Sequence, residues 1–159
     1  MPINQILGRS YMKRALVAIS LIAVVSTVVF AQEPTVLPQA DAAKYAPAPF
    51  PPGAQQAIIV GNPKNAEGYV IRVKLAKGTK VAPHMHPNDE NVTVISGTFH
   101  IGVGEKFDEA QGQMVKTWGY VNVPKGKAHF AWVSEDSVIQ LHGVGPAGAT
   151  FVNPADAPK

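Results

Sequence analysis

Residues 78–97 read GTKVAPHMHPNDENVTVISG and contain two of the chain's five histidines, followed by a glutamate. On an extended strand, residues i and i+2 point to the same side, so His84 and His86 can present two imidazoles to one point in space. Proline on both sides of this pair restricts the backbone, which favours a strand end over the middle of a sheet. A turn at residues 87–89 could then bring the Glu90 carboxylate back toward both rings.

Two imidazoles and a carboxylate suit iron, manganese, nickel, copper or zinc, whereas calcium and magnesium prefer sites built from oxygen alone. A third nitrogen donor would complete a usable set. The best candidate is His129, which follows the turn Pro124-Lys125-Gly126 and begins the segment HFAWV. These side chains are therefore candidate ligands for one divalent transition metal.

The residues around this stretch have the sequence pattern of an all-β protein. From residue 57 onward, short β-branched runs are separated by Gly, Pro and Asn, which is typical of a sandwich or barrel. Residues 68–75, GYVIRVKL, alternate so that Tyr69, Ile71, Val73 and Leu75 share one face of a half-buried strand. Further strands are predicted at residues 80–86, 90–96, 98–103, 118–123, 128–133 and 137–143. Seven or eight such strands indicate a compact antiparallel barrel.

Residues 78–97 resemble the first motif of the cupin superfamily. That motif runs Gly, five residues, His, one, His, three or four, Glu, six, Gly, and the chain matches every fixed position. The second cupin motif runs Gly, five residues, Pro, one, Gly, two, His, three, Asn. Here GYVNVPKGKAH keeps the proline, the second glycine and His129, but Gly119 is one residue too close and Val133 replaces the asparagine. These departures concern the start of the strand near residues 118–120 and leave the histidine in place.

The resemblance covers roughly residues 57–145 and is to small single-domain cupins of the cupin-2 type. It implies an all-β fold, a single jelly-roll-like antiparallel β-barrel with the metal inside. It also implies that His84, His86, Glu90 and His129 are the four protein ligands. One or two positions on an octahedral metal would then remain for water, dioxygen or substrate.

Three functions remain open at this point. A metal-dependent oxidoreductase of the dioxygenase type, acting on a small organic molecule, is expected first, because many cupins with this ligand set are dioxygenases. A non-oxidative decarboxylase or isomerase would need an additional acid or base near the metal. A non-catalytic barrel that binds or senses a small molecule or a metal needs only the ligands and a pocket. The catalytic residues, the metal's identity and the substrate do not follow from the sequence.

Other polar and aromatic residues are weaker candidates. Gln140 and His142 alternate with apolar residues in SVIQLHGVG and could contact substrate or orient a ligand imidazole, if their face lines the barrel. Solvent exposure of that face is the alternative. His100 is expected on the surface, and residues 104–116, GEKFDEAQGQMVK, are expected to form a solvated hairpin connection without chemistry.

The N-terminal residues predict export. Basic residues without an acid precede an apolar run, and small residues lie where signal peptidase would cut after Ala31, so residues 1–31 are predicted to be a secretory signal peptide. An uncleaved membrane anchor and a translation start at Met12 remain open. Residues 32–56 hold six of the 14 prolines and are predicted to be an extended arm or linker. Residues 57–159 would form the cupin domain with a short C-terminal tail.

Charge and cysteine content limit the partners. Residues 1–31 contain three of the 14 basic residues and none of the 11 acidic ones, so the rest of the chain has 11 of each. Near-zero net charge gives no electrostatic reason for binding nucleic acid or an anionic membrane surface. Cysteine is absent, which excludes thiol chemistry. We expect a periplasmic or secreted protein that binds a small molecule, has no stable membrane association after signal cleavage, and forms a homodimer through its arm and edge strands.

Overall fold

The computed structural model describes residues 34–37 and 42–158. The predicted signal peptide, residues 1–31, and the first residues of the predicted arm lie outside the described residues. Within the described residues, no helix is long and apolar enough to cross a membrane.

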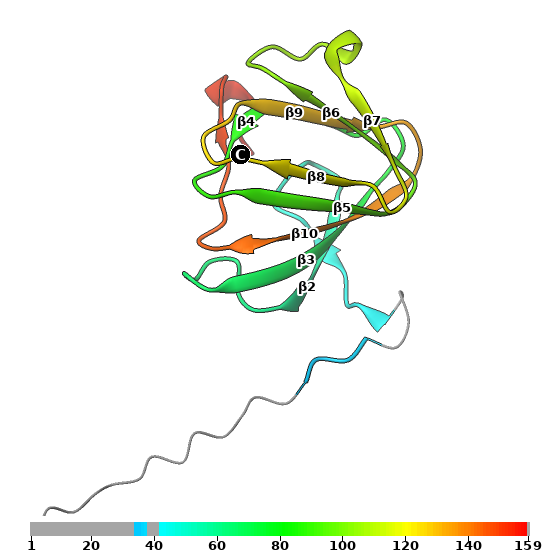
Figure 1. Cartoon of the computed structure of the whole chain (residues 1–159), viewed down its shortest axis with the longest axis vertical. Helices are drawn as coiled ribbons and strands as arrows, with labels where there is room; N and C mark the ends of the chain where they lie inside the picture. Colours follow the sequence, from blue (N-terminus) through cyan, green and yellow to red (C-terminus); the bar gives the residue numbers. More distant parts are fainter. Residues whose placement is uncertain (1–33, 38–41, 159) are drawn as a thin grey trace, which may run out of the picture. The chain divides into compact units, whose positions relative to one another are not determined.

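The described residues form two antiparallel sheets that face each other (Figure 1). One sheet has six strands in the order β1-β2-β3-β10-β5-β8, and the other has five in the order β11-β4-β9-β6-β7. The strands are β1 (Ala46–Pro47), β2 (Gln55–Val60), β3 (Gly68–Leu75), β4 (Lys80–Met85), β5 (Glu90–Ser96), β6 (Thr98–Val103), β7 (Gln113–Lys116), β8 (Tyr120–Val123), β9 (His129–Val133), β10 (Ser137–Val144) and β11 (Thr150–Phe151). The described residues also contain two short 3-10 helices, η2 (Glu109–Gln111) and η3 (Pro154–Asp156).

The all-β, jelly-roll-like antiparallel fold predicted from the sequence is confirmed, but the two sheets are not closed into a barrel. Among residues 34–37 and 42–158, strand pairing occurs only within each sheet. The outermost strands, β1, β8, β11 and β7, are two to four residues long, so they offer few backbone groups for pairing across the gap. The domain is therefore a two-sheet sandwich, in which the chain passes from one sheet to the other at turns such as that between β5 and β6.

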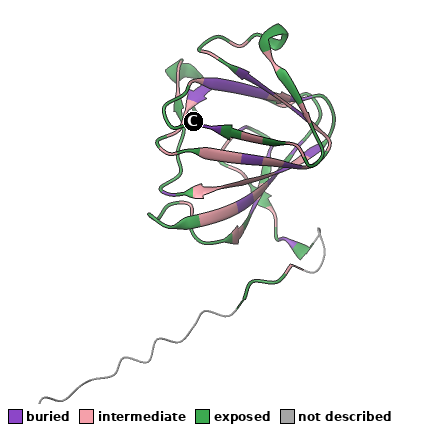
Figure 2. Cartoon of the chain, in the orientation of Figure 1, coloured by how far each residue is buried: buried purple, intermediate pink, exposed green. Residues whose placement is uncertain are grey.

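The core lies between the sheets and is built by alternation along each strand (Figure 2). On β3, Ile71, Val73 and Leu75 are buried, as their shared face predicts. On β5, Val92 and Val94 are almost fully buried and continue the face that Glu90 begins. This alternation directs Glu90 into the space between the sheets.

The segment expected to be a solvated connection has more structure than the sequence indicated. It contains β7, which pairs with β6, and Phe107, whose ring lies 5.0 Å from Phe130 and 5.7 Å from Trp132. Phe130 and Trp132 alternate with His129 and point away from the core, yet Phe130 is only 1% exposed. The segment therefore covers the outer face of β9.

Trp118 explains the departure in the second cupin motif. It occupies the position where the motif has its first glycine, and its φ of 68° lies in the left-handed region that glycine adopts without strain. The Trp118 amide donates to Val94 and the Gly119 carbonyl accepts from the Val94 amide, so the turn still leads the chain into β8 beside β5. The side chain is 78% exposed.

The described part of the predicted arm lies against the sandwich. β1 pairs with β2, and the amide of Ala48 donates to the carbonyl of Ala54. Lys74 on β3 places its ammonium 4.0 Å from the centre of the Tyr45 ring. This part of the chain therefore extends the six-stranded sheet.

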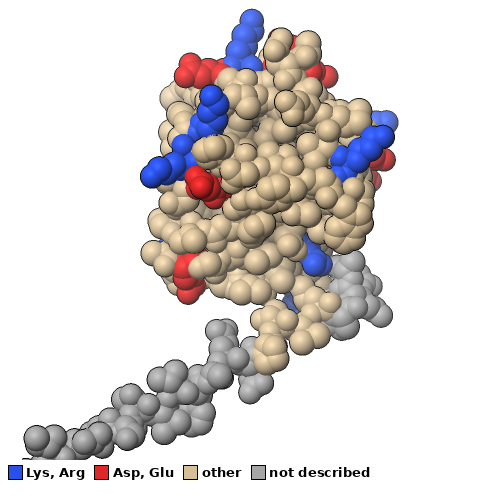
Figure 3. All heavy atoms as spheres, in the orientation of Figure 1, with Lys and Arg blue, Asp and Glu red and all other residues tan. Residues whose placement is uncertain are grey.

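Charged side chains on the face drawn in Figure 3 lie mainly around its edges, with both signs represented. The middle of this face, over β5, β8 and β10, is mostly uncharged.

Candidate metal centre

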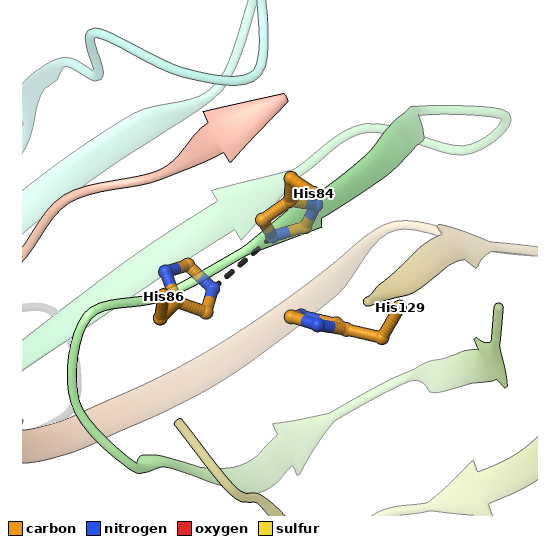
Figure 4. A group of neighbouring side chains, drawn as sticks. All are labelled: His84, His86 and His129. Carbon is orange, nitrogen blue, oxygen red and sulfur yellow. Dashed lines mark hydrogen bonds between the residues drawn. The ribbon is translucent and has the colours of Figure 1, made fainter. Parts of the chain in front are cut away.

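Three histidines and a glutamate meet at one end of the sandwich. His84 on β4 and His129 on β9 are direct cross-strand partners, so their side chains share the inner face of the five-stranded sheet. His86 comes directly after β4, two residues beyond His84, and Glu90 begins β5 in the opposite sheet. Figure 4 shows the three imidazoles pointing toward one another.

The donor atoms lie close together. One ring nitrogen from each histidine can be chosen so that all three lie within 4.8 Å of one another. The Nε2 atoms of His84 and His86 are 3.1 Å apart. The Glu90 carboxylate places Oε1 3.4 Å from His86 Nε2 and Oε2 3.5 Å from His129 Nε2. The structure thus brings together all four side chains that were predicted as metal ligands from the sequence.

Backbone carbonyls orient each ring. Nδ1 lies 2.7 Å from the Ala82 oxygen in His84, 2.6 Å from the Gly148 oxygen in His86, and 3.0 Å from the Lys127 oxygen in His129. A carbonyl oxygen only accepts, so each Nδ1 must donate its proton. The lone pair of each neutral ring is then on Nε2, which is the arrangement found in metal-binding histidines.

These hydrogen bonds test whether the residues fit a metal ion. With Nδ1 protonated in both rings, the contact between His84 Nε2 and His86 Nε2 is a hydrogen bond only if one ring is a doubly protonated imidazolium. Otherwise two lone pairs face each other, which requires a cation beside them. Three imidazole lone pairs and one carboxylate are a set that suits a divalent transition metal, so the residues fit such an ion.

Burial and neighbouring charges set the protonation of these groups. Burial lowers the pKa of His84 to about 4. Burial also acts to lower the pKa of His86, but the hydrogen bond and the negative charge of Glu90 outweigh it and raise this pKa above its usual 6.5. For Glu90, burial favours the protonated form, yet the contacts with His129 and His86 hold its pKa at about 2. The site thus keeps an ionised carboxylate beside a largely neutral His84.

Two aromatic side chains pack against His84. The Phe50 ring lies 5.5 Å from the His84 ring and 4.7 Å from the Phe151 ring, both in edge-on geometry. Phe50 precedes β2 and Phe151 ends the chain's last strand, so two distant segments meet over this histidine. They leave His84 only 4% exposed, which explains its lowered pKa.

The loops around the site are tied to one another. The amide of Gly126 donates to the carbonyl of His86, and the amide of Lys125 donates to the Asp89 carboxylate at 2.8 Å. Asn88 donates to the Pro146 carbonyl at 3.1 Å. These bonds connect the turn before β9 and the segment after β10 to the loop that joins His86 to Glu90.

A cavity of about 320 Å³ opens beside the four side chains and extends between the sheets. The six-stranded sheet contributes Ile71, Val73, Leu75, Val92, Ile139 and Leu141 to its wall. The five-stranded sheet contributes Val81, Phe99, Ile101 and Ala131. This volume is near the lower end of the range for small-molecule sites.

Tyr69 also lines this cavity, at the end where the histidines lie. It is the cross-strand partner of Gly143 on β10, and a Cβ built on Gly143 would lie 3.4 Å from the Tyr69 hydroxyl oxygen. Burial, and after it the charge of Glu90, raises the pKa of this hydroxyl above 10.0. The phenol therefore stays protonated and able to donate.

Two of the sequence candidates lie elsewhere. Gln140 and His142 are on the face of β10 opposite to Ile139 and Leu141, which line the cavity. Gln140 accepts a hydrogen bond from Arg72 at 3.1 Å, within the same sheet. The structure therefore does not bring Gln140 or His142 to the histidine cluster.

His100 also lies apart from the cluster, on β6. It is stacked on Trp132 with ring centres 4.7 Å apart, on the outer face of the five-stranded sheet, as its alternation with apolar residues suggested. It offers a histidine outside the site for control substitutions.

Sequence reasoning missed several contributors to the site. The Gly148 carbonyl, which fixes the His86 ring, is a backbone group with no signature in the sequence. Phe50 fell within the predicted arm, and Phe151 within the predicted tail, so neither was connected to His84. Tyr69 was placed on the correct face of its strand, but its reach toward the site depends on the pairing with Gly143.

Comparison with known proteins agrees with the fold. Residues 34–148 match the family described as the ChrR Cupin-like domain. A search of curated proteins finds no match.

Among solved structures with a similar fold is a candidate acetylacetone dioxygenase from Methylibium petroleiphilum PM1, with 18% identity and a TM-score of 0.59 over 82% of this chain and 90% of that chain. The polyketide cyclase RemF from Streptomyces resistomycificus has 12% identity and a TM-score of 0.60, with the same coverage of 82% and 90%. KdgF from Halomonas sp. has 21% identity and a TM-score of 0.52 over 67% of this chain and 93% of that chain. At these identities the likenesses show the fold alone.

Proposed function

Because the chain belongs to the family of ChrR Cupin-like domains within the cupin superfamily, we propose that it binds one divalent transition metal and uses it as a dioxygenase-type oxidoreductase on a small organic molecule. His84, His86, Glu90 and His129 would hold the metal. The cavity beside them would hold the organic molecule.

The observation that supports metal binding most strongly is the tautomer of the three histidines. Each Nδ1 donates to a backbone carbonyl, so three Nε2 lone pairs converge beside one carboxylate. The convergence of four acceptors at one point is explained by a bound cation.

The protein's own residues then bind and orient the metal and the substrate and exclude water from the site. A bound metal of this class would supply a Lewis acid with exchangeable positions and, for iron, manganese, nickel or copper, access to oxygen chemistry. Phe50 and Phe151 pack against His84 and exclude water from it. The apolar walls of the cavity, to which Phe50 also belongs, exclude water from the space where a substrate would lie and so strengthen electrostatic interactions there.

Oxygen uptake tests the enzymatic proposal. The purified protein, loaded in turn with iron, manganese, nickel and copper, is placed in an oxygen electrode with a panel of catechols, diketones and simple ketones. We expect consumption of oxygen that depends on one of these compounds and is abolished by His84→Ala. His100→Ala, which changes a histidine on the outer face of β6, should retain it.

Retained metal without oxygen uptake for any compound would instead support a binding or sensing protein. Uptake that persists in His84→Ala would contradict the assignment of the site. A thermal unfolding curve for each variant separates loss of chemistry from loss of fold.

Export and self-association are further parts of the proposal. The basic and apolar residues before Ala31 favour secretion or delivery to the periplasm, with removal of residues 1–31 and no stable membrane association afterwards. N-terminal sequencing of the secreted protein and its mass in solution would test cleavage and the expected homodimer.

A further inference from the structure

The walls of the cavity differ sharply from its polar end. Away from the histidines the cavity is lined mainly by aliphatic and aromatic side chains of both sheets, represented by Val73, Leu75, Val81 and Ile139. These side chains cannot donate or accept a hydrogen bond, and Gln56, the cross-strand partner of Val73, adds a single amide to this part of the lining. A hydroxyl, phosphate or carboxylate placed there would lose its hydration without replacement, which is costly.

The charged side chains that line the cavity are confined to the end where the histidines lie. Apart from the histidines they are Lys64, Asp89 and Glu90. Lys64 and Asp89 are exposed, and Asp89 is engaged by the amide of Lys125. Glu90 contacts His86 and His129. Within the described residues, no lysine or arginine lines the deep part of the cavity.

Tyr69 provides a hydrogen-bond donor at the polar end. Tyr69 is at the start of β3, which pairs with the end of β10, and the end of β10 pairs with the start of β5 next to Glu90. Because residue 143 is glycine, no side chain there fills the space beside the Tyr69 hydroxyl. Among the described residues this hydroxyl has no hydrogen-bond partner, and it is accessible to solvent.

From this division we infer the substrate class, an inference that rests on the proposed function: a small molecule with one polar head and an uncharged hydrocarbon body. The head lies between the histidine cluster and the Tyr69 hydroxyl, and the body extends between the sheets. Sugars, phosphate esters and dicarboxylates are excluded because the walls offer their polar groups only the Gln56 amide, which leaves most of those groups unpaired. Tyr69 is a positioning residue for the head.

The test uses 1-hexanol and 1,6-hexanediol, which share one head and one chain and differ only in a second hydroxyl, with D-glucose as a polyol of similar size. Dissociation constants are measured by saturation-transfer NMR. We expect 1-hexanol to bind about fivefold or more tightly than 1,6-hexanediol, because the second hydroxyl would be buried unpaired. D-Glucose should not compete with 1-hexanol.

The experiment is run on the metal-loaded protein and on the His86→Ala/Glu90→Ala variant. The walls are the same in both, so the preference for 1-hexanol should survive in the variant even if the wild-type protein binds no metal. Failure of the proposed metal site is therefore distinguishable from failure of the substrate class. Equal or tighter binding of 1,6-hexanediol or D-glucose, or no binding of 1-hexanol to either protein, would overturn the inference.

Two further variants test the assigned positions. Tyr69→Phe keeps the ring over Gly143 and removes only the hydroxyl, and it should weaken 1-hexanol about threefold to tenfold without changing metal content. Ala131→Leu fills the cavity from β9 and should weaken 1-hexanol by a similar factor, with the fold checked by thermal unfolding. An unchanged affinity in Tyr69→Phe would remove Tyr69 from the site, and an unchanged affinity in Ala131→Leu would place the ligand outside the cavity.

Discussion

The Nε2 atoms of His84 and His86 lie 3.1 Å apart while the Nδ1 atom of each ring donates to a backbone carbonyl. Two neutral rings in this arrangement direct lone pairs at each other, so a proton or a metal ion must share the space between them. Glu90 raises the pKa of His86 above 6.5, which favours a proton on this nitrogen when no metal is bound. Protons and metal therefore compete for the same nitrogen.

The first prediction concerns pH. Below the raised pKa of His86 its Nε2 holds a proton that the metal must displace, so metal affinity should fall as pH falls from 8 to 5, by about tenfold per unit once His86 is protonated. His84, with a pKa of about 4, adds no competition in this range. Chelator competition at several pH values measures the slope. Affinity that is constant from pH 8 to 5 would show that the metal does not use His86.

The second prediction concerns the cover over His84. Phe50→Ala removes a half-buried ring that contacts His84 and Phe151, and it should lower the free energy of unfolding by about 2 kcal/mol. It should also speed the loss of metal to a chelator, because water reaches His84. Tyr45→Ala is the control, since Tyr45 contacts Lys74 away from the site. Equal metal loss rates in the two variants would contradict a covering role for Phe50.

The third prediction concerns Trp118. A non-glycine residue in the left-handed region is strained by roughly 1–2 kcal/mol. Glycine removes this strain, but part of the stabilisation is lost because glycine makes the unfolded chain more flexible. Trp118→Gly should therefore stabilise the protein by up to about 1 kcal/mol in urea unfolding. Trp118→Ala, which keeps the strain, should show no such gain. A large destabilisation by Trp118→Gly would mean that the exposed ring makes a stabilising contact.

The fourth prediction compares two glycines of the cupin motifs. Gly97 has a φ of +84°, and a Cβ there would lie 2.3 Å from Ser137 Oγ and 2.6 Å from the Asp136 carbonyl oxygen. Gly126 has a similar φ of +70° with no atom within 4 Å of its Cβ position. Gly97→Ala should cost at least about 2 kcal/mol and Gly126→Ala about 1 kcal/mol, since only the first adds a clash to the strain. Similar losses would indicate that the turn at Gly97 can move.

Alternation and motif spacing predicted the fold well for definite reasons. A period of two placed Ile71, Val73 and Leu75 in the core, and the spacing from Gly78 to Gly97 located a strand, a loop and the next strand. Closure of the barrel was predicted wrongly, because residue types do not indicate how long the outermost strands are. The contact of Phe107 with the outer face of β9 was missed, because the charged residues around Phe107 are typical of a solvent-exposed loop.

The four ligand candidates could be found because a metal site needs particular side chains at fixed spacing along two strands. Gly148, Phe50 and Phe151 could not be found, because each reaches the histidines through contacts between segments distant in sequence. The outer placement of Gln140 and His142 follows from the strand alternation, but the choice of inner face required the pairing of β10 with β3 and β5.

The metal content of the purified protein tests the central claim most directly. Elemental mass spectrometry is applied to the wild-type chain and to the His86→Ala/Glu90→Ala variant, with His100→Ala as the matched control. We predict about one transition-metal ion per chain in the wild type and in His100→Ala, and loss of the ion in the double variant. A folded wild-type protein that holds no metal, even after exposure to iron, manganese, nickel, copper and zinc, would contradict the account.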